Sequence, residues 1–231
     1  HLSLRRQRQM CIRDRFISDL HKIKYNKPPK VRNNYINQQL NFSEIEMMYT
    51  SSDPEIVVID DFLTKDFLED LRIFFRCANI FKYPYSRGYI GAFLGKGMAN
   101  KALLEFSTEL KKSFKKIFLN YNLSQAWSFK YDSKREGIGV HADDARVNEN
   151  FWITNDSANM NNANGGKIIW KKTPKDTSSF EDFNSLKSID KIKEEIKDTG
   201  STRIPYKSNR AVIFNSKLYH LTDKIEFKDN Y

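Results

Sequence analysis

The stretch that decides the fold is WSFKYDSKREGIGVHADDARVNENFWIT, residues 127–154. Within it, short runs of aromatic and β-branched residues alternate with Gly, Asp and Asn, the residues that favour turns. The same pattern continues toward the end of the chain and predicts a series of short strands. The predicted strands are AWSFKYD (126–132), GIGVHAD (137–143), NFWIT (150–154), GKIIW (166–170) and RAVIFN (210–215).

The chain before residue 126 has helical periodicity instead. EIVVIDDFL (55–63) predicts one strand, and Thr64 is placed to cap a helix whose apolar residues recur through 67–75. A second amphipathic helix is predicted over 100–119. Helices followed by many short strands are typical of an α+β protein built on a sandwich or a jelly roll.

A helical insertion is predicted between the last two strands, at about residues 178–198. Its apolar residues return at helical spacing, and Gly200 can end the helix. We interpret the insertion as a packed surface element, with a lid over a site as the alternative. The spaced apolar residues are Leu186, Ile189, Ile192 and Ile196.

The predicted domain covers residues 53–231, helical over 53–125 and strand-rich over 126–231. Residues 16–52 are polar and are interrupted by NKPPK, so we interpret them as a linker or as the tail of an upstream region. Residues 1–15 include MCIRDR, which resembles the translation of a transposase adapter used in sequencing libraries. We therefore expect residues 1–15 to be a non-native artefact.

The formal charge of +10 invites a nucleic-acid-binding interpretation. Residues 1–15 carry five Arg and one Asp, however, and the chain without them has a charge of +6. Lysine outnumbers arginine, and no basic stripe interleaved with aromatic residues stands out. A solvated, lysine-rich surface is the better explanation, and nucleic acid is not the expected partner.

Neither a membrane nor a disulfide framework is expected. No apolar run approaches the length of about 18–20 residues that crosses a bilayer. Cys11 and Cys77 are too few for a disulfide scaffold, so a reducing, cytoplasmic location is predicted.

Histidines supply the strongest chemical signal. Of the four in the chain, His141 and His220 lie in the predicted domain, and Asp143 follows His141 by two positions. Residues i and i+2 of a strand point to the same face, so His141 and Asp143 can bind one ion, with His220 arriving from a later, adjacent strand. Two imidazoles and one carboxylate form the facial triad of non-haem Fe(II) oxygenases.

The wider pattern resembles the 2-oxoglutarate- and Fe(II)-dependent oxygenases, in particular their prolyl-hydroxylase-like members. The segments that carry the resemblance are residues 127–154, NGGKIIW (164–170), NRAVIFNSKLYHLTD (209–223) and the opening PEIVVIDDFLTKDFLEDLRIFF (54–75). It covers about residues 53–231 and implies a double-stranded β-helix, or jelly roll, with flanking N-terminal helices.

Carried over residue by residue, the resemblance makes His141, Asp143 and His220 the catalytic iron ligands. Tyr131 matches a tyrosine that helps to hold 2-oxoglutarate in such enzymes, with a core tyrosine as the alternative. Asp144 is off the ligand face of the strand and is expected to be structural or to support a ligand without binding the metal itself. The implied reaction hydroxylates a peptidyl side chain or a small molecule, with 2-oxoglutarate and O₂ as cosubstrates and succinate and CO₂ as products.

The sequence departs from the family pattern after the distal histidine. The family places an Arg or Lys on the following strand, where it pairs with the far carboxylate of 2-oxoglutarate. Lys224 and Lys228 lie in a predicted turn or loop, and Arg210 is expected to form a surface ion pair. We therefore expect the 231-residue chain to be a fragment whose last jelly-roll strand, with its Arg, lies beyond Tyr231.

Two other functions remain open at this point. One is a cupin-like jelly roll that binds a metal for a different reaction or for none. The other is a basic nucleic-acid-binding module without catalysis, which would bind DNA or RNA with a steep dependence on salt. The identity of the substrate is not readable from the sequence.

Overall fold

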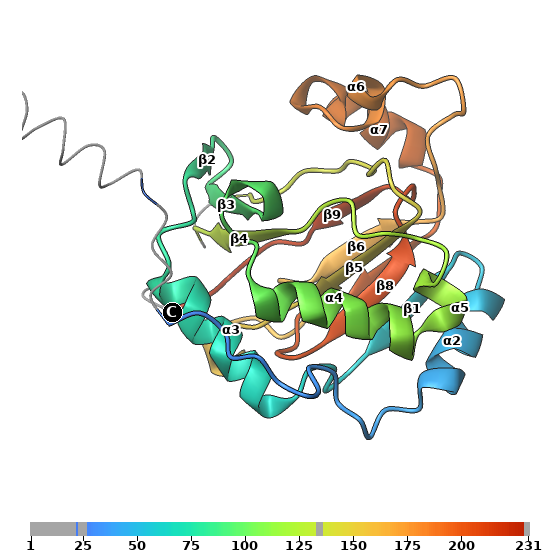
Figure 1. The fold of residues 1–231 in the computed structure, drawn as a ribbon. Helices are drawn as coiled ribbons and strands as arrows, with labels where there is room; N and C mark the ends of the chain where they lie inside the picture. The colour runs from blue at the N-terminus through green and yellow to red at the C-terminus, as the bar shows by residue number, and fades with distance from the viewer. Residues whose placement is uncertain (1–21, 23–26, 133–135, 229–231) are drawn as a thin grey trace, which may run out of the picture.

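The computed structural model describes residues 22, 27–132 and 136–228 and shows an α+β protein (Figure 1). The helices are α2 (Phe42–Ser51), α3 (Lys65–Cys77), α4 (Lys101–Ser113), α5 (Lys115–Phe118), α6 (Phe180–Phe183) and α7 (Ile189–Ile196), with 3-10 turns η1 (Leu94–Lys96), η2 (Asp156–Ala158) and η3 (Leu186–Ser188). The strands are β1 (Ile56–Ile59), β2 (Tyr83–Tyr85), β3 (Tyr89–Phe93), β4 (Trp127–Tyr131), β5 (Val147–Phe151), β6 (Lys167–Trp170), β7 (Ser201–Ile204), β8 (Ala211–Asn215) and β9 (His220–Thr222). The interpretation of residues 1–15 as an artefact lies outside the described residues.

The strands form antiparallel sheets of three strands each, with the orders β1-β8-β5, β2-β3-β4 and β7-β6-β9. In the first sheet β8 is central, since Ile213 pairs with Val57 of β1 and with Glu149 of β5. In the third sheet β6 is central, and its Ile169 pairs with His220 of β9. The α+β class predicted from the sequence is confirmed.

The two faces of β8 belong to two different parts of the core. Ala211 and Ile213 face the helical layer, because residues i and i+2 of a strand share a face. Val212 and Phe214 face the opposite way and pack with Ile169 of β6, in the cluster that joins this sheet to β7-β6-β9. Sheets β1-β8-β5 and β7-β6-β9 therefore pack against each other through their inner faces. His220, the first residue of β9 in the latter sheet, lies beside Phe214 of β8.

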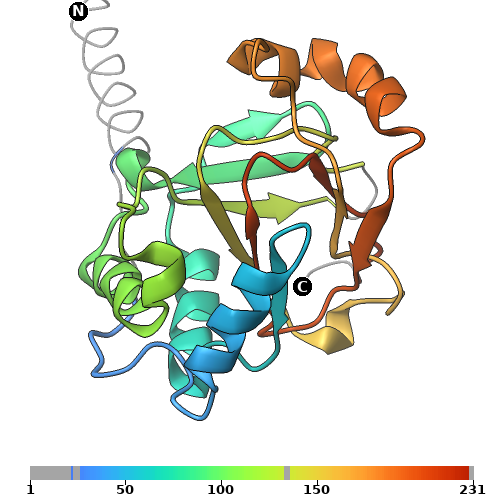
Figure 2. The ribbon, with the colours of Figure 1, turned by 90° about the vertical axis from the view of Figure 1, so that its right-hand side faces the viewer.

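The helical layer covers the outer face of sheet β1-β8-β5. Helix α3 begins where the sequence predicted, with the Thr64 hydroxyl accepting a hydrogen bond from the Phe67 N–H at 3.4 Å. Its buried face includes Phe67 and Phe74, which join Phe106 of α4 in one aromatic core. Figures 1 and 2 show these helices on one side of the molecule and α6 with α7 on another.

Several predicted boundaries need correction. The predicted strand 137–143 is not a regular strand and holds only an isolated bridge at His141. Its glycines explain this, because Gly137 has a positive φ of 71° that breaks extended pairing. The predicted helix 100–119 is divided into α4 and α5 at Phe114, where φ is −120° and ψ is 65°. The short strands β7 and β9 were not predicted.

The described part of the predicted linker is integrated into the fold. Tyr35, Ile36, Ile45 and Tyr49 are buried in the main core, and α2 packs on β1. Residues 35–51, which the sequence analysis interpreted as part of a linker or upstream tail, thus contribute apolar side chains to the main core, while Met47 and Met48 remain exposed. In the part of the chain that the structure describes, no helix has the length and apolar character needed to cross a membrane.

Candidate metal centre

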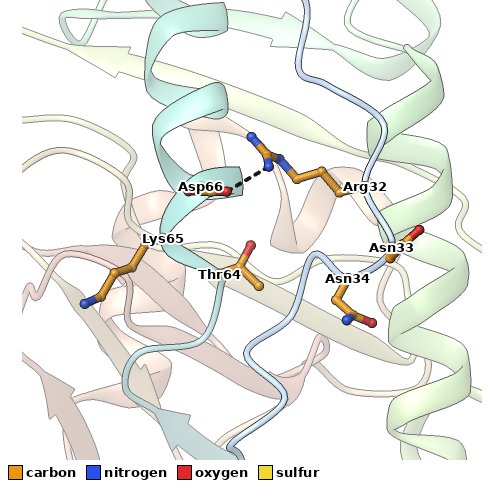
Figure 3. Close-up of a pocket in the computed structure, with 6 residues that line it drawn as sticks. All are labelled: Arg32, Asn33, Asn34, Thr64, Lys65 and Asp66. Atoms are coloured by element: carbon orange, nitrogen blue, oxygen red, sulfur yellow. Dashed lines mark hydrogen bonds and ion pairs between the residues drawn. The ribbon is translucent and has the colours of Figure 1, made fainter.

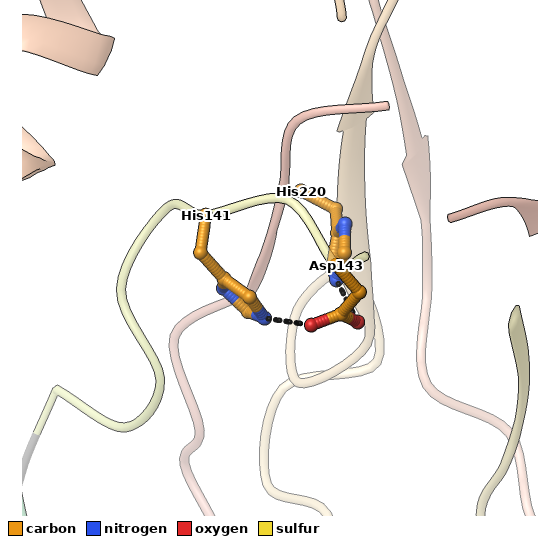
Figure 4. Close-up of side chains that lie close together, drawn as sticks. All are labelled: His141, Asp143 and His220. Carbon is orange, nitrogen blue, oxygen red and sulfur yellow. Dashed lines mark ion pairs between the residues drawn. The ribbon is translucent and has the colours of Figure 1, made fainter. Parts of the chain in front are cut away.

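The three predicted metal ligands converge on one point (Figure 4). One ligand atom from each of His141, Asp143 and His220 lies within 4.8 Å of the other two. Nε2 of His141 is 3.8 Å from Asp143 Oδ1, and Nε2 of His220 is 3.5 Å from Asp143 Oδ2. His220 is buried, whereas His141 and Asp143 keep 19% and 15% of their side-chain surface exposed, so the group can be reached from solvent on one side.

The backbone brings the ligands together by direct pairing. The N–H of His141 donates to the carbonyl of His220 at 3.0 Å, and the N–H of His220 donates back to the carbonyl of His141 at 2.8 Å. The N–H of Asp143 then donates to the carbonyl of Ser216 at 3.0 Å. The segment with the first two ligands thus lies beside the segment that leads into β9, as the sequence predicted for His220.

In each imidazole, Nδ1 is hydrogen-bonded to a backbone carbonyl and Nε2 faces the Asp143 carboxylate. Nδ1 of His141 lies 2.8 Å from the carbonyl oxygen of Gly139, and Nδ1 of His220 lies 2.8 Å from that of Leu218. A carbonyl oxygen can only accept, so both Nδ1 atoms carry the proton. The Nε2 lone pairs are then available to a metal, in the arrangement that orients histidine ligands in metal sites.

Electrostatics keep the ligands in their metal-binding forms. Burial, with a smaller effect from His220, lowers the pKa of His141 to about 3, and burial also lowers the pKa of His220. Burial alone would raise the pKa of Asp143, but the His220 imidazole and the Asn148 amide lower it below its ordinary value. At neutral pH the group consists of two neutral imidazoles and one carboxylate, the forms that bind a divalent cation.

Both oxygens of the Asp143 carboxylate accept a hydrogen bond from an amide. Nδ2 of Asn148, on β5, donates to Oδ2 at 2.5 Å. Nδ2 of Asn184, which directly follows α6, donates to Oδ1 at 3.2 Å. These two contacts fix the rotation of the carboxylate from opposite sides, and each oxygen still has a lone pair for a metal.

A buried lysine lies beside the metal ligands. Lys167, the first residue of β6, pairs with Thr222 of β9 and is 7% exposed. Its Nζ lies 5.2 Å from the centroid of the Phe214 ring, and among the described residues it has no hydrogen-bond or ion-pair partner. Burial lowers the pKa of Lys167 to about 8, while the charge of Asp143 acts in the opposite direction. The charge of this lysine in turn lowers the pKa of His220, so the ammonium group acts on the site electrostatically.

Tyr131 lies next to the site and is not one of the converging ligands. Its hydroxyl is 3.4 Å from Oγ1 of Thr222, which follows His220 by two positions on β9. Burial raises the pKa of Tyr131, so the phenol stays protonated and can donate a hydrogen bond. The Thr222 hydroxyl thus lies close to the Tyr131 hydroxyl, and the backbone of Thr222 pairs with that of Lys167 on the neighbouring strand β6.

The remaining predicted residues lie outside the site. Asp144 is exposed and does not belong to the converging group. Arg210 forms an ion pair with Asp60 through Nε and Nη2, at 2.6 and 3.1 Å, which lowers the pKa of Asp60 to about 2. The predicted ion pair of Arg210 is therefore present, with the guanidinium partly buried and not fully at the surface.

The two lysines after the distal histidine also face elsewhere. Lys224 forms a 2.6 Å ion pair with Glu226 and is 73% exposed. Lys228 is exposed, with its N–H bonded to the carbonyl of Ala158. Of the lysines described near the end of the chain, Lys224 and Lys228 are therefore exposed to solvent, whereas Lys167 is buried beside the candidate site.

A surface hollow elsewhere on the molecule shares no residue with the metal ligands (Figure 3). It has a volume of about 400 Å³ and is open to solvent. Arg32, its strongest cation, is already paired with Asp66 at 3.0 Å and with Asp70 at 2.8 Å. The hollow therefore offers no convergent chemistry, and His141, Asp143 and His220 remain the candidate metal centre among the described residues. The hollow is lined by Arg32, Asn33, Asn34, Thr64, Lys65 and Asp66.

Three residues of the centre were not singled out from the sequence: Lys167, Asn148 and Asn184. Lys167 carried a readable signal, since it is the one charged residue in the apolar strand GKIIW. Asn148 and Asn184 carried no such signal. Their contacts with Asp143, across five and 41 positions, arise from the folded arrangement and follow no sequence period.

Comparison of the chain with protein-family models, curated proteins and solved structures gives no match. The function is therefore argued from the geometry of the centre.

Proposed function

We propose that this protein is an Fe(II)- and 2-oxoglutarate-dependent dioxygenase that hydroxylates a peptidyl side chain or a small molecule. The observation that carries the proposal is the paired anchoring of His141 and His220, whose Nδ1 protons are bound by backbone carbonyls while both Nε2 atoms turn toward Asp143. A structural histidine pair has no need of two free nitrogens beside a carboxylate, whereas a metal needs all three groups.

The donor set fits iron better than the other common protein metals. Two imidazole nitrogens and one carboxylate leave coordination positions open for substrate groups, which is typical of non-haem Fe(II) oxygenases. A structural zinc site would be closed by a fourth protein ligand. When bound, Fe(II) supplies the oxidising chemistry that couples decarboxylation of 2-oxoglutarate to hydroxylation of a substrate.

The chain's own residues prepare the centre for an anionic cosubstrate. Lys167 holds a desolvated ammonium group with no protein partner among the described residues, and such a charge is stabilised by an incoming carboxylate. Tyr131 and Thr222 add hydroxyl groups beside it. We assign Lys167 to the far carboxylate of 2-oxoglutarate, the position that the family pattern gives to an Arg or Lys.

The jelly-roll architecture is part of this proposal. Its support is the face-to-face packing of β1-β8-β5 on β7-β6-β9, with the His141 segment paired to the residue that opens β9. In a jelly roll of this kind the ligands lie between the two sheets, which limits the access of water to the reacting groups.

The test is formation of succinate from 2-oxoglutarate in the presence of Fe(II) and O₂. The wild-type chain should form succinate only when Fe(II) is added, and His220→Ala should abolish it. Asp144→Ala is the matched control, since Asp144 is an exposed carboxylate next to a ligand, and it should retain the activity. Metal binding without succinate formation at saturating 2-oxoglutarate would contradict the proposal and favour a cupin-like metal-binding protein.

A further inference from the structure

The helical insertion of α6, η3 and α7 contacts both segments that carry the metal ligands. Figures 1 and 2 show it as a separate layer at the edge of the sheets. Its apolar side chains Ile192 and Ile196 form a buried cluster with Val140 and Ala142 on one ligand segment and with Tyr219 on the other. A packed element is therefore present at this edge, as the sequence predicted.

The packing is close at the glycine before the first ligand. A Cβ placed on Gly139 would lie 2.8 Å from Cδ1 of Ile189, so the first residue of α7 uses the space that the glycine leaves. The Tyr219 hydroxyl donates to Glu195 at 3.2 Å and ties the same helix to the residue before His220. Leu186, which the periodicity placed on the packed face, is instead 63% exposed because it lies in η3 and not in a continuous helix.

Polar contacts continue this packing as far as the ligand carboxylate. The N–H of Ala142, between the two ligands, donates to the carbonyl of Phe183 at 2.9 Å. The side-chain amide of Asn184 donates to the carbonyl of Ala142 at 2.7 Å and to Asp143 Oδ1 at 3.2 Å. The Asn184 side chain thus contacts both the backbone of Ala142, the residue between the two ligands, and the Asp143 carboxylate.

We propose that the insertion is a brace for the metal centre and that Asn184 is the positioning residue through which it acts. The inference rests on the proposed metal site, and it concerns the orientation of Asp143 and not the reaction. With Asn184 in place, the carboxylate is held from both sides, by Asn148 at Oδ2 and by Asn184 at Oδ1. Without it, Oδ1 loses its amide donor and the carboxylate can rotate away from the two Nε2 atoms.

The coupling runs in both directions. If docking of the insertion favours metal binding, metal binding must favour docking of the insertion by the same factor. Groups that orient a metal ligand typically change metal affinity by about 10- to 100-fold when they are removed. We therefore expect slower amide exchange over residues 178–198 when the centre is loaded.

The experiment measures Mn(II) affinity for the full chain and three variants. Asn184→Ala should weaken binding by about 10- to 100-fold, and Asn184→Gln, which keeps the amide donor, should recover part of it. Leu186→Ala is the control within the same insertion, because its side chain is 63% exposed and is not a member of the buried cluster, and it should bind like the wild type. The melting temperature of each metal-free variant shows whether the fold itself is affected.

A second readout uses the unmodified chain, so that it does not depend on how a variant folds. Hydrogen exchange over 178–198 should slow on addition of Mn(II). Equal Mn(II) affinity of Asn184→Ala and wild type, or exchange that does not respond to the metal, would overturn the brace while leaving the oxygenase proposal intact. If Asn184→Ala weakens Mn(II) binding and the metal slows exchange as expected, but no succinate forms, the oxygenase proposal alone is overturned. A wild-type chain that binds no Mn(II) would overturn both proposals.

Discussion

His141 and His220 are joined by a reciprocal pair of backbone hydrogen bonds, of 3.0 and 2.8 Å, and their imidazole rings lie 4.3 Å apart between centroids. Main-chain pairing therefore fixes the separation of the two backbones, and the contacts of each Nδ1 with a backbone carbonyl, at 2.8 Å, hold the ring orientations that bring the two Nε2 atoms together. Such preorganisation lowers the cost of forming a metal site, because little conformational entropy is lost when the ion binds.

Lys167→Met should weaken 2-oxoglutarate binding and stabilise the fold. Loss of one charge-assisted contact typically costs about 1.5–3 kcal/mol, or roughly 10- to 150-fold in affinity. The folded-state pKa of Lys167 is about 8, below its ordinary value of 10.5, so the native state at neutral pH bears the cost of a buried charge that Met does not have. Calorimetric titration of Mn(II)-loaded protein with 2-oxoglutarate and urea unfolding measure the two effects. Unchanged 2-oxoglutarate affinity would remove Lys167 from the cosubstrate site.

Glu149 should make stability depend on pH. Its Oε1 is buried without a hydrogen-bond partner among the described residues, and burial raises its pKa from 4.5 to about 8. Because the folded state holds this proton more tightly than the unfolded state, stability is greatest below about pH 4.5 as far as this group is concerned, and it falls as pH rises through about 8.

Glu149→Gln removes that dependence without changing the size of the side chain. Each pKa unit corresponds to about 1.4 kcal/mol, so the variant should gain stability over the wild type as the pH is raised from 5.5 to 8.5. Urea unfolding at the two pH values measures the difference. A constant difference between the proteins at both pH values would mean that Glu149 is solvated in the folded state.

Gly166→Ala should destabilise the strand pair that carries Lys167. An added Cβ would lie 1.9 Å from the carbonyl oxygen of Ile204, a backbone atom that cannot move without breaking the pairing of β6 with β7. Overpacking of this kind costs about 1–3 kcal/mol or more. Gly95→Ala is the control, because nothing lies within 4 Å of its added Cβ, and it should leave the melting temperature nearly unchanged. Equal melting temperatures for the two variants would contradict the close approach of β6 and β7.

The sequence was informative where the signal was local. Short aromatic and β-branched runs between turn residues located β6 and β8, and Thr64 located the start of α3. The spacing of His141 and Asp143 identified a chelating pair. Such features depend on neighbouring residues, whose geometry is fixed by the backbone period.

The features that the sequence did not predict depend on tertiary contacts. Asn184 reaches Asp143 across 41 positions, and no periodicity marks an asparagine that acts at such a distance. Tyr35 and Ile36 lie in a polar segment with no regular pattern, yet both are buried by the aromatic core of α3 and α4. Lys167 was recognisable from the sequence as the one charged residue of an apolar strand, but its position beside His220 depends on the pairing of β6 with β9.

The central claim is that His141, Asp143 and His220 bind one divalent metal ion. Its most direct measurement is a titration of the full chain with Mn(II), followed by electron paramagnetic resonance of the free ion, for the wild type, His141→Ala, His220→Ala and Asp144→Ala. We predict one tightly bound Mn(II) per wild-type chain, its loss in both histidine variants because two ligands hold a divalent ion poorly, and its retention in Asp144→Ala. Stoichiometric binding that survives His141→Ala and His220→Ala, or a wild-type chain that binds no Mn(II), would contradict it.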